Sequence, residues 1–315
     1  MNEIESENVP QAYVETIVKM HYWGREETSR NGPVITSANP VLVTIYKPAE
    51  RVLTDPVRDA NPFFHVMEFV WMMAGSNDVR WIEQFNKRFR EYADPGTDII
   101  HGAYGHRWRT HFDVDQIRAV ADRLKEDCNT RQAVMAMWDP RVDLAQHNDI
   151  PCNTQIMFRY DVQRTELDMT VINRSNDLIW GMLGANAVHM TYLHELVSHM
   201  AGLRMGRYKA FTNNLHIYPE MPKFKEIWRT WVSVDKYDTQ AFGPYPLMQP
   251  RETYEDLVAD CQNLIRGSYD PIRTQWMLNV AEPMFSSWHS RHNTNRIHAI
   301  DWQIACKEWL ERRKK

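Results

Sequence analysis

Residues 151–177, PCNTQIMFRYDVQRTELDMTVINRSND, decide the fold class of this chain. Gln155 to Tyr160 and Leu167 to Asn173 are rich in β-branched and aromatic residues and predict two strands. A turn at Gln163-Arg164 would pair these strands. Cys152 directly follows a proline at the start of the first strand, so the stretch combines a sheet signal with a thiol.

The segments on either side predict both helices and strands. The clearest helix is FFHVMEFVWMMA, framed by Asn61 as N-cap, Pro62 at the first helical position and Gly75 after the end. The other expected elements are strands at Val41 to Tyr46 and Ala133 to Met137, and helices at Val114 to Asp127, Ala187 to Leu203, Tyr254 to Arg266 and Ile297 to Arg312. We therefore expect an α+β fold with a mainly antiparallel or mixed sheet, in a single domain over residues 1–315.

The composition argues against two classes of partner. Lys and Arg number 37 against 41 Asp and Glu, a net charge of −4, which disfavours a protein that grips polymeric nucleic acid. The longest apolar stretches, such as Val66 to Ala74, are too short to cross a bilayer, and the polar start MNEIESENVP is not typical of a signal peptide. We expect a cytoplasmic protein that binds a small phosphorylated ligand and no membrane.

Four widely separated cysteines indicate reduced thiols, and neither a disulfide framework nor a zinc ribbon. A zinc nucleobase deaminase would carry P-C-x-x-C, but Gln155 stands where the second cysteine belongs. No metal is expected.

Two side chains are candidates for chemistry, each with an ordinary alternative. Cys152 could be a nucleophile whose pKa is lowered by cations in neighbouring segments, such as Arg174, or a half-buried structural cysteine. Glu68 lies on the apolar stripe of its helix, with Phe64 at i−4 and Trp71 at i+3. Burial there would raise the pKa of its carboxyl and suit it to acid/base work, although a buried Glu paired with a structural arginine fits as well.

Three polar loops could bind an anion. The run from Asn173 to Asp177 places a cation, a hydroxyl, two amides and a carboxylate after a strand, which suits recognition of phosphate and of a base. The loops around Arg131 and Arg30 each carry one arginine. Each loop taken alone is more simply a solvated segment, because most arginines are exposed.

Taken in order, the motifs between Asn61 and Tyr218 resemble the thymidylate synthase family. The family's nucleophile motif Pro-Cys-His is similar to Pro151-Cys152-Asn153, and its Arg-Ser-x-Asp is similar to Arg174-Ser175-Asn176-Asp177. Its Tyr-Gly-x-x-Trp-Arg resembles residues 104–109, and its His-x-Tyr resembles His216-Ile217-Tyr218.

The resemblance implies a role for each matching residue. Cys152 would add to C6 of a pyrimidine nucleotide beside Asn153, while Glu68 would relay protons at the exocyclic edge of the ring. The phosphate, sugar and base would be bound by Arg30, Arg131, Arg174, Ser175, Asn186, His216 and Tyr218, and 5,10-methylenetetrahydrofolate by Asp177, Trp71 and Tyr104, with Asp177 also acting in catalysis. Arg131 would come from the partner subunit of a homodimer with shared sites.

The departures from a thymidylate synthase concern the steps after carbon transfer. Asn153 replaces the His beside the nucleophile, Gln132 replaces an Arg, and the charged end KEWLERRKK stands where the family has an apolar tail that closes over the folate. If closure is missing, water can add to the methylene intermediate in place of hydride. This pattern resembles the deoxypyrimidine monophosphate hydroxymethylases, a branch of the family, and implies a 5-hydroxymethyl product in a virus that modifies its DNA.

The sequence leaves alternatives open. A thymidylate synthase making dTMP would differ only in the fate of the methylene. Asn186 favours the uracil of dUMP, because its amide can donate to O4 and accept from N3–H, but its alignment needs one inserted residue, so dCMP or a ribonucleotide remains an alternative. A non-catalytic relative that binds nucleotides or RNA is the alternative from another class.

Overall fold

The computed structural model describes residues 1–232, 235–239 and 242–314. Its main sheet is mixed and has the strand order β1 (Asn2–Ser6), β4 (Val41–Ile45), β9 (Arg204–Thr212), β7 (Glu166–Asn173), β6 (Asn153–Asp161) and β5 (Val134–Ala136). A second sheet has the order β2 (Gly24–Ser29), β3 (Gly32–Ser37), β10 (Leu215–Ile217) and β8 (Asn176–Asp177). The expected α+β class with a mixed sheet is confirmed.

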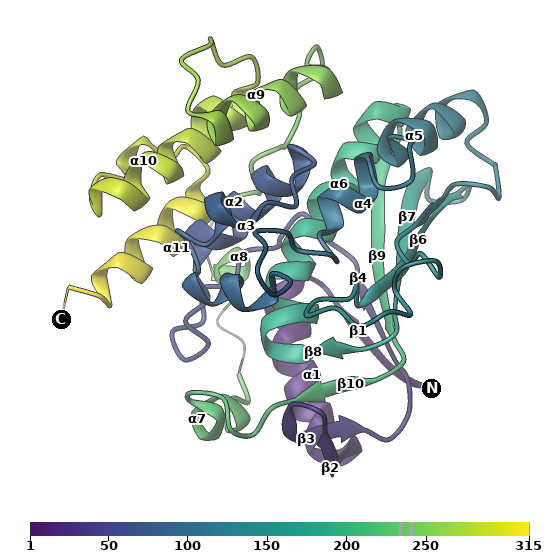
Figure 1. Cartoon of the computed structure of the whole chain (residues 1–315), viewed down its shortest axis with the longest axis vertical. Helices are drawn as coiled ribbons and strands as arrows, with labels where there is room; N and C mark the ends of the chain where they lie inside the picture. Colours follow the sequence, from purple (N-terminus) through teal and green to yellow (C-terminus); the bar gives the residue numbers. More distant parts are fainter. Residues whose placement is uncertain (233–234, 240–241, 315) are drawn as a thin grey trace.

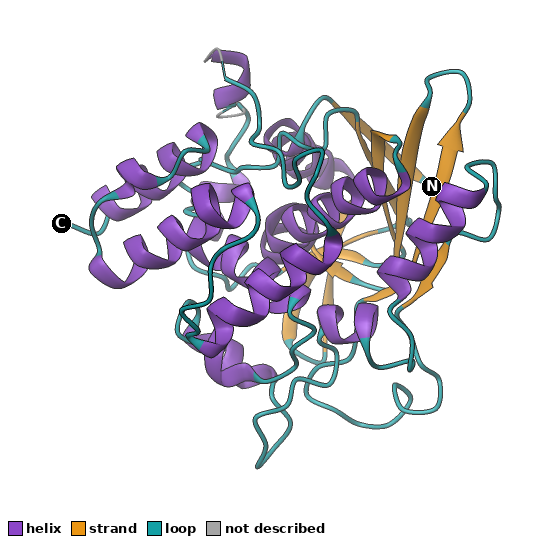
Figure 2. Cartoon of the chain, turned by 90° about the horizontal axis from the view of Figure 1, so that it is seen from above, coloured by secondary structure: helices purple, strands orange, loops and turns teal. Residues whose placement is uncertain are grey.

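The helical segments are α1 (Val9–Trp23), α2 (Pro62–Met73), α3 (Val79–Ile82), η1 (Lys87–Tyr92), α4 (Tyr104–Arg109), α5 (Gln116–Glu126), η2 (Leu178–Ala185), α6 (Asn186–Ala201), α7 (Phe224–Trp228), α8 (Lys236–Thr239), α9 (Tyr254–Arg266), η3 (Met277–Ala281), α10 (Glu282–Ser290), η4 (Thr294–Arg296) and α11 (Ile300–Glu311). Figure 1 places α2, α9, α10 and α11 on one side of the molecule and the six-stranded sheet on the other. The view from above in Figure 2 shows the same separation of helices and strands. Among the described residues, no helix has the length and apolar character needed to cross a membrane.

The hairpin of β6 and β7 forms as the sequence predicts. The two strands are antiparallel, and their register pairs Asn153 with Asn173. The segment before β6 and the segment after β7 therefore lie side by side. The short strand β8 follows at once and leaves the main sheet for the second sheet, so the two sheets meet at the residues after Asn173.

Helix α2 packs among other helices, including α6, α9, α10 and α11. The side chain of Asn61 accepts a hydrogen bond from the Phe64 N–H at 3.2 Å, which caps the helix as expected. Every residue of α2 is buried, as a helix that is apolar all round should be. Helix α4 approaches it closely at Gly105, where a Cβ would stand 2.0 Å from the Met72 carbonyl oxygen. This approach brings the segment of Tyr104 towards the helix that carries Glu68.

Most expected boundaries hold to within about three residues, a normal spread for helix and strand ends. Helix α1 was not predicted, and neither were six of the strands: β3, β8, β9, β10 and the two polar strands β1 (NEIES) and β2 (GREETS). The strands β1 and β2 lie at the edge of their sheets and carry mostly polar side chains. Their pairing therefore depends on the neighbouring strand, and no apolar periodicity marks them in the sequence.

Candidate active site

Cys152 lies at the end of the loop that leads into β6, beside Arg174 at the end of β7. The Arg174 N–H donates to the Cys152 carbonyl at 2.9 Å. The Arg174 guanidinium donates to the carbonyls of Pro151 at 3.0 Å and Ile150 at 2.9 Å, and its Nη2 lies 3.9 Å from the Cys152 Sγ. One arginine thus holds the backbone that carries the thiol and also faces the sulfur.

The pKa of the Cys152 thiol is raised, so the expectation of a lowered pKa is wrong. Burial is the largest cause, while the charges of Arg174 and Arg30 act in the opposite direction. Removal of the thiolate from water outweighs the attraction of the cations. The thiol is therefore mainly protonated before a substrate arrives.

Glu68 projects from α2 and is 7% exposed. Burial and the charge of Asp149 raise the pKa of its carboxyl well above the ordinary value. Its Oε2 lies 3.4 Å from Nε2 of His189 on α6, but that nitrogen also lies 3.1 Å from the His65 carbonyl. Burial lowers the pKa of His189 to about 3. Glu68 is therefore a protonated acid beside a neutral imidazole, and the expected alternative of an arginine partner is not seen among the described residues.

Asn153 and Tyr104 fix the backbone beside the thiol. The Asn153 N–H donates to the Tyr104 hydroxyl at 3.3 Å, and the Asn153 amide donates to the Ile172 carbonyl at 2.9 Å. Asn153 is fully buried, and its Oδ1 has no hydrogen-bond partner among the described residues. Burial, followed by the charge of Cys152, raises the pKa of Tyr104 well above the ordinary value. Tyr104, expected at the folate, is thus also a neighbour of the nucleophile.

Asp177 caps η2 and leaves one oxygen free. Its Oδ1 accepts from the Trp180 N–H at 2.5 Å, whereas its buried Oδ2 has no partner in the described part of the chain. Burial raises the pKa of this carboxyl. Asn186, the first residue of α6, donates from Nδ2 to the Asn176 Oδ1 at 3.4 Å. Asp177 and Asn186 therefore stand at the two ends of η2.

The second sheet brings His216, Tyr218 and Arg30 together. His216 is paired in register with Asp177 on β8, and its ring lies 5.1 Å from that of Tyr218 in an edge-on arrangement. The Tyr218 hydroxyl accepts from the Asn31 amide at 3.4 Å, in the turn between β2 and β3. The neighbouring Arg30 is exposed, yet its charge acts on the Cys152 thiol. The hairpin of β2 and β3 thus carries Arg30 to the site.

Three expected site residues are placed differently from one another. Ser175 is half-buried directly after Arg174. Arg131 is exposed on the loop before β5. Trp71 is 1% exposed and donates its indole N–H to the Asp78 carbonyl at 2.8 Å. The structure thus places Trp71 in the core, without a surface for the expected contact with folate.

The motifs missed three ionisable residues of this site. His189 beside Glu68 carries the same signal as Glu68, an ionisable side chain on an apolar helix, and could have been found by it. Arg58 donates from Nε to the Ile179 carbonyl at 2.9 Å and acts on the carboxyl of Asp177. Asp149 acts on both Glu68 and Cys152. Neither Arg58 nor Asp149 lies in a motif, so only the fold associates them with the thiol.

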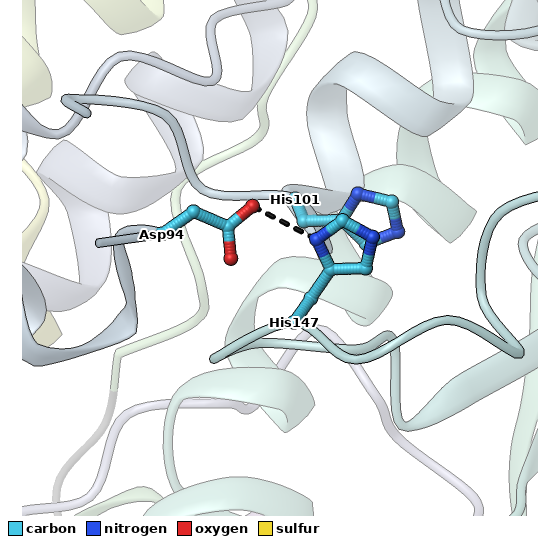
Figure 3. A group of neighbouring side chains, drawn as sticks. All are labelled: Asp94, His101 and His147. Carbon is cyan, nitrogen blue, oxygen red and sulfur yellow. Dashed lines mark hydrogen bonds and ion pairs between the residues drawn. The ribbon is translucent and has the colours of Figure 1, made fainter. Parts of the chain in front are cut away.

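Asp94, His101 and His147 form a second cluster (Figure 3), and the charge of Asp94 acts on the carboxyl of Asp149. The two imidazoles stack at 3.6 Å with an interplanar angle of 4°, so their ring nitrogens lie in parallel planes and do not point at one position. His147 bonds to Asp94 at 2.9 Å, and His101 bonds to Asp143 at 2.7 Å. We interpret the cluster as a clamp that holds the loop before Cys152.

The comparisons with known proteins agree with this site. The profile of the thymidylate synthase family matches residues 11–257. The chain is 39% identical to a protein of Pseudomonas phage M6 named deoxyuridylate hydroxymethyltransferase, over 100% of this chain and 95% of that protein. A protein of the same name from Bacillus phage SP01 is 33% identical over 59% of this chain and 51% of its own. A putative thymidylate synthase of Methanothermobacter marburgensis is 27% identical over 69% of this chain and 92% of its own.

Proposed function

This chain belongs to the thymidylate synthase family, and we propose that it converts deoxyuridylate to 5-hydroxymethyldeoxyuridylate. The observation that carries the proposal is that Arg174 faces the Cys152 thiol and that the charge of Asp149 acts on both Cys152 and Glu68, in a chain similar over its whole length to a phage deoxyuridylate hydroxymethyltransferase. Enzymes of this kind are one-carbon transferases. 5,10-Methylenetetrahydrofolate supplies the one-carbon unit when it is bound.

Cys152 begins the reaction by adding to C6 of the uracil ring. Its raised pKa means that the thiol must lose a proton as the nucleotide binds, and the Arg174 guanidinium at 3.9 Å stabilises the thiolate that forms. Glu68, held protonated by burial, can donate a proton at the exocyclic oxygen O4 as negative charge develops there.

The base is read by Asn186. One hydrogen of its Nδ2 is directed to Asn176, which leaves the second hydrogen and Oδ1 for O4 and N3–H of uracil. A cytosine ring offers the opposite pattern at these atoms, which supports deoxyuridylate over deoxycytidylate.

The residues that remain fit the folate and the sugar. A pterin presents N–H donors, and the buried Oδ2 of Asp177 is an acceptor without a partner among the described residues, so the site fits this cofactor. The Tyr104 hydroxyl, which accepts from the Asn153 N–H beside the thiol, would also contact the folate. His216 and Tyr218, arranged edge-on, would hold the sugar hydroxyl.

We further propose a homodimer in which Arg131 reaches the site of the partner subunit. In one chain the phosphate set consists of Arg30, Arg174 and Ser175, while Arg131 is exposed at the edge of the main sheet. Val134, which follows in β5, is 43% exposed. A two-fold axis at this sheet would bury that apolar surface and share both sites. All four cysteines are free, which supports a reducing compartment such as the cytoplasm of a phage host.

The test is a product assay with deoxyuridylate or deoxycytidylate and methylenetetrahydrofolate. The proposal expects 5-hydroxymethyldeoxyuridylate, detected by mass spectrometry, together with tetrahydrofolate. Thymidylate together with dihydrofolate would identify a thymidylate synthase instead. Hydroxymethylation of deoxycytidylate alone would overturn the role given to Asn186.

A further inference from the structure

Asp149 is a carboxylate that none of the roles above uses. It is half-buried and precedes Cys152 in the segment whose Ile150 and Pro151 carbonyls are bound by Arg174. Its Oδ2 lies against Gly102, since a Cβ built on that glycine would stand 2.5 Å from this oxygen. The carboxylate is therefore held by its own segment on one side and by the segment that leads into α4 on the other.

This position brings Asp149 close to the nucleophile and to the acid. Its charge raises the pKa of Glu68, of Cys152 and of Tyr104. Tyr104 begins the helix just after Gly102, and its hydroxyl accepts from the N–H of Asn153. Asp149 thus lies within electrostatic range of Glu68, Cys152 and Tyr104.

The two carboxyl groups near Cys152 are suited to opposite tasks. Burial raises the pKa of Asp149 only to about 6, because the charge of Arg174, a hydrogen bond from Gly102 and the charge of Arg107 oppose it. For Glu68, no cation among the described residues opposes burial, and the pKa of its carboxyl is raised well above the ordinary value. Above neutral pH, Asp149 is mainly ionised and can accept a proton, whereas Glu68 can donate one. Such a pair indicates a base and an acid.

We propose that Asp149 is the general base that deprotonates the water added to the exocyclic methylene, an inference that rests on the proposed hydroxymethylase function. The water oxygen forms a bond to the methylene carbon, and one of its protons passes to the Asp149 carboxylate. The electron pair of the methylene double bond moves into the ring as an enolate. The enolate then forms the C5–C6 double bond while the bond from C6 to the Cys152 sulfur breaks. Nothing is oxidised or reduced, and Asp149 returns its proton to solvent.

The decisive variant is Asp149→Asn, tested with deoxyuridylate tritiated at C5. Release of tritium reports addition of Cys152 and carbon transfer, whereas the hydroxymethyl product reports hydration. We expect hydroxymethyl formation to fall by about 10²- to 10⁴-fold, the usual range for loss of a general base, with a much smaller fall in tritium release. An added thiol should then capture the methylene as a thioether, because water no longer competes well.

The matched control is Asp94→Asn, which removes a carboxylate that anchors the same loop through His147 but lies outside the catalytic cluster. It should keep the wild-type ratio of hydroxymethyl product to released tritium. Asp149→Glu should restore part of the product, and thermal unfolding of each variant reports folding. An equal fall of both readouts in a folded Asp149→Asn protein, or an unchanged ratio, would overturn the inference. Absence of hydroxymethyl product from the wild-type enzyme would instead overturn the proposed function.

The pH profile gives a second readout. The charged and titratable groups that act on Asp149 or on which it acts are Arg174, Arg107, Asp94, Glu68, Cys152, Tyr104 and Tyr92. Hydroxymethyl formation by the wild-type enzyme should decline as pH falls through about 6, where the carboxylate takes up a proton. This acidic limb should disappear in Asp149→Asn. A limb that persists there would assign it to another group and contradict the proposed role.

Discussion

The carboxyl of Glu68 and the imidazole of His189 lie 3.4 Å apart and do not form an ion pair. Burial is the largest cause of the pKa shift in both groups. It raises the pKa of the Glu68 carboxyl and lowers the pKa of the His189 imidazole to about 3. The Nε2 of His189 also lies 3.1 Å from the His65 carbonyl, so the Glu68 Oε2 has no hydrogen-bond partner among the described residues. A buried acid in this state can serve a substrate, at a cost in stability.

Glu68→Gln tests that cost. The folded pKa of Glu68 lies above its unfolded value, so the unfolded chain loses this proton first as pH rises, and the folded state loses stability. Compared with Glu68→Gln, the wild-type protein should therefore become progressively less stable between pH 5 and pH 8, as measured by thermal unfolding. Turnover of the variant should fall by about 10²-fold or more. Glu26→Gln, at an exposed residue of β2, is the control, and an equal pH slope in all three proteins would contradict this account.

Cys152→Ser should abolish hydroxymethyl formation and keep the dissociation constant for deoxyuridylate within a few-fold. The reason is that a serine hydroxyl is far less acidic than a thiol and cannot add to C6. Calorimetry and the product assay measure the two quantities. Cys128→Ser, at another half-buried free cysteine, should retain full activity. Turnover by Cys152→Ser would exclude the proposed covalent step.

Arg174→Gln should slow the alkylation of Cys152. The guanidinium lowers the pKa of a thiol that burial raises, so its loss leaves less thiolate at a given pH. The rate of modification by iodoacetamide can be followed by mass spectrometry between pH 7 and pH 10. Its pH profile in Arg174→Gln should be displaced to higher pH. Arg159→Gln, at an exposed arginine of β6, provides the comparison. A shift of equal size there would point to a general loss of positive charge.

Gly105→Ala should destabilise the fold and the site together. The added Cβ would meet the carbonyl oxygen of Met72 at 2.0 Å and its Cα at 2.2 Å. Both are backbone atoms, so α4 must move away from α2 at a cost of about 1–3 kcal/mol. Urea unfolding measures this cost. Gly243→Ala, where nothing lies within 4 Å of the added atom, should have little effect, and an equally stable Gly105→Ala protein would contradict the packing described.

Mixing two inactive variants tests the shared site. Arg131→Ala keeps Cys152 but cannot complete the partner's phosphate site, and Cys152→Ser keeps Arg131. If subunits exchange, half of the dimers are mixed and each contains one intact site, which restores about a quarter of wild-type activity. If a tagged subunit demonstrates exchange and no activity returns, Arg131 acts within its own chain. An Arg131→Ala protein that is fully active alone would show that Arg131 has no role in the site.

The sequence by itself determined the local elements with strong patterns. The cap at Asn61, the apolar run of α2 and the β6–β7 hairpin were predicted because capping and periodicity act over a few residues. The polar edge strands β1 and β2 were not predicted from the sequence, because only the neighbouring strand stabilises them. The motifs around Cys152, Arg174 and His216 were recognisable because each is contiguous in the chain.

The tertiary structure alone decided the protonation states of these groups and which residues surround them. The sequence predicted a Cys152 pKa lowered by cations, but burial raises this pKa, and burial depends on what the rest of the chain packs around the thiol. Trp71 was expected to face the ligand but lies in the core. Asp149 and His189 joined the site for the same reason: residues far apart in the chain meet only when the sheet and α2 pack together. Desolvation and electrostatic range are properties of that packed volume, and no local pattern of residues encodes them.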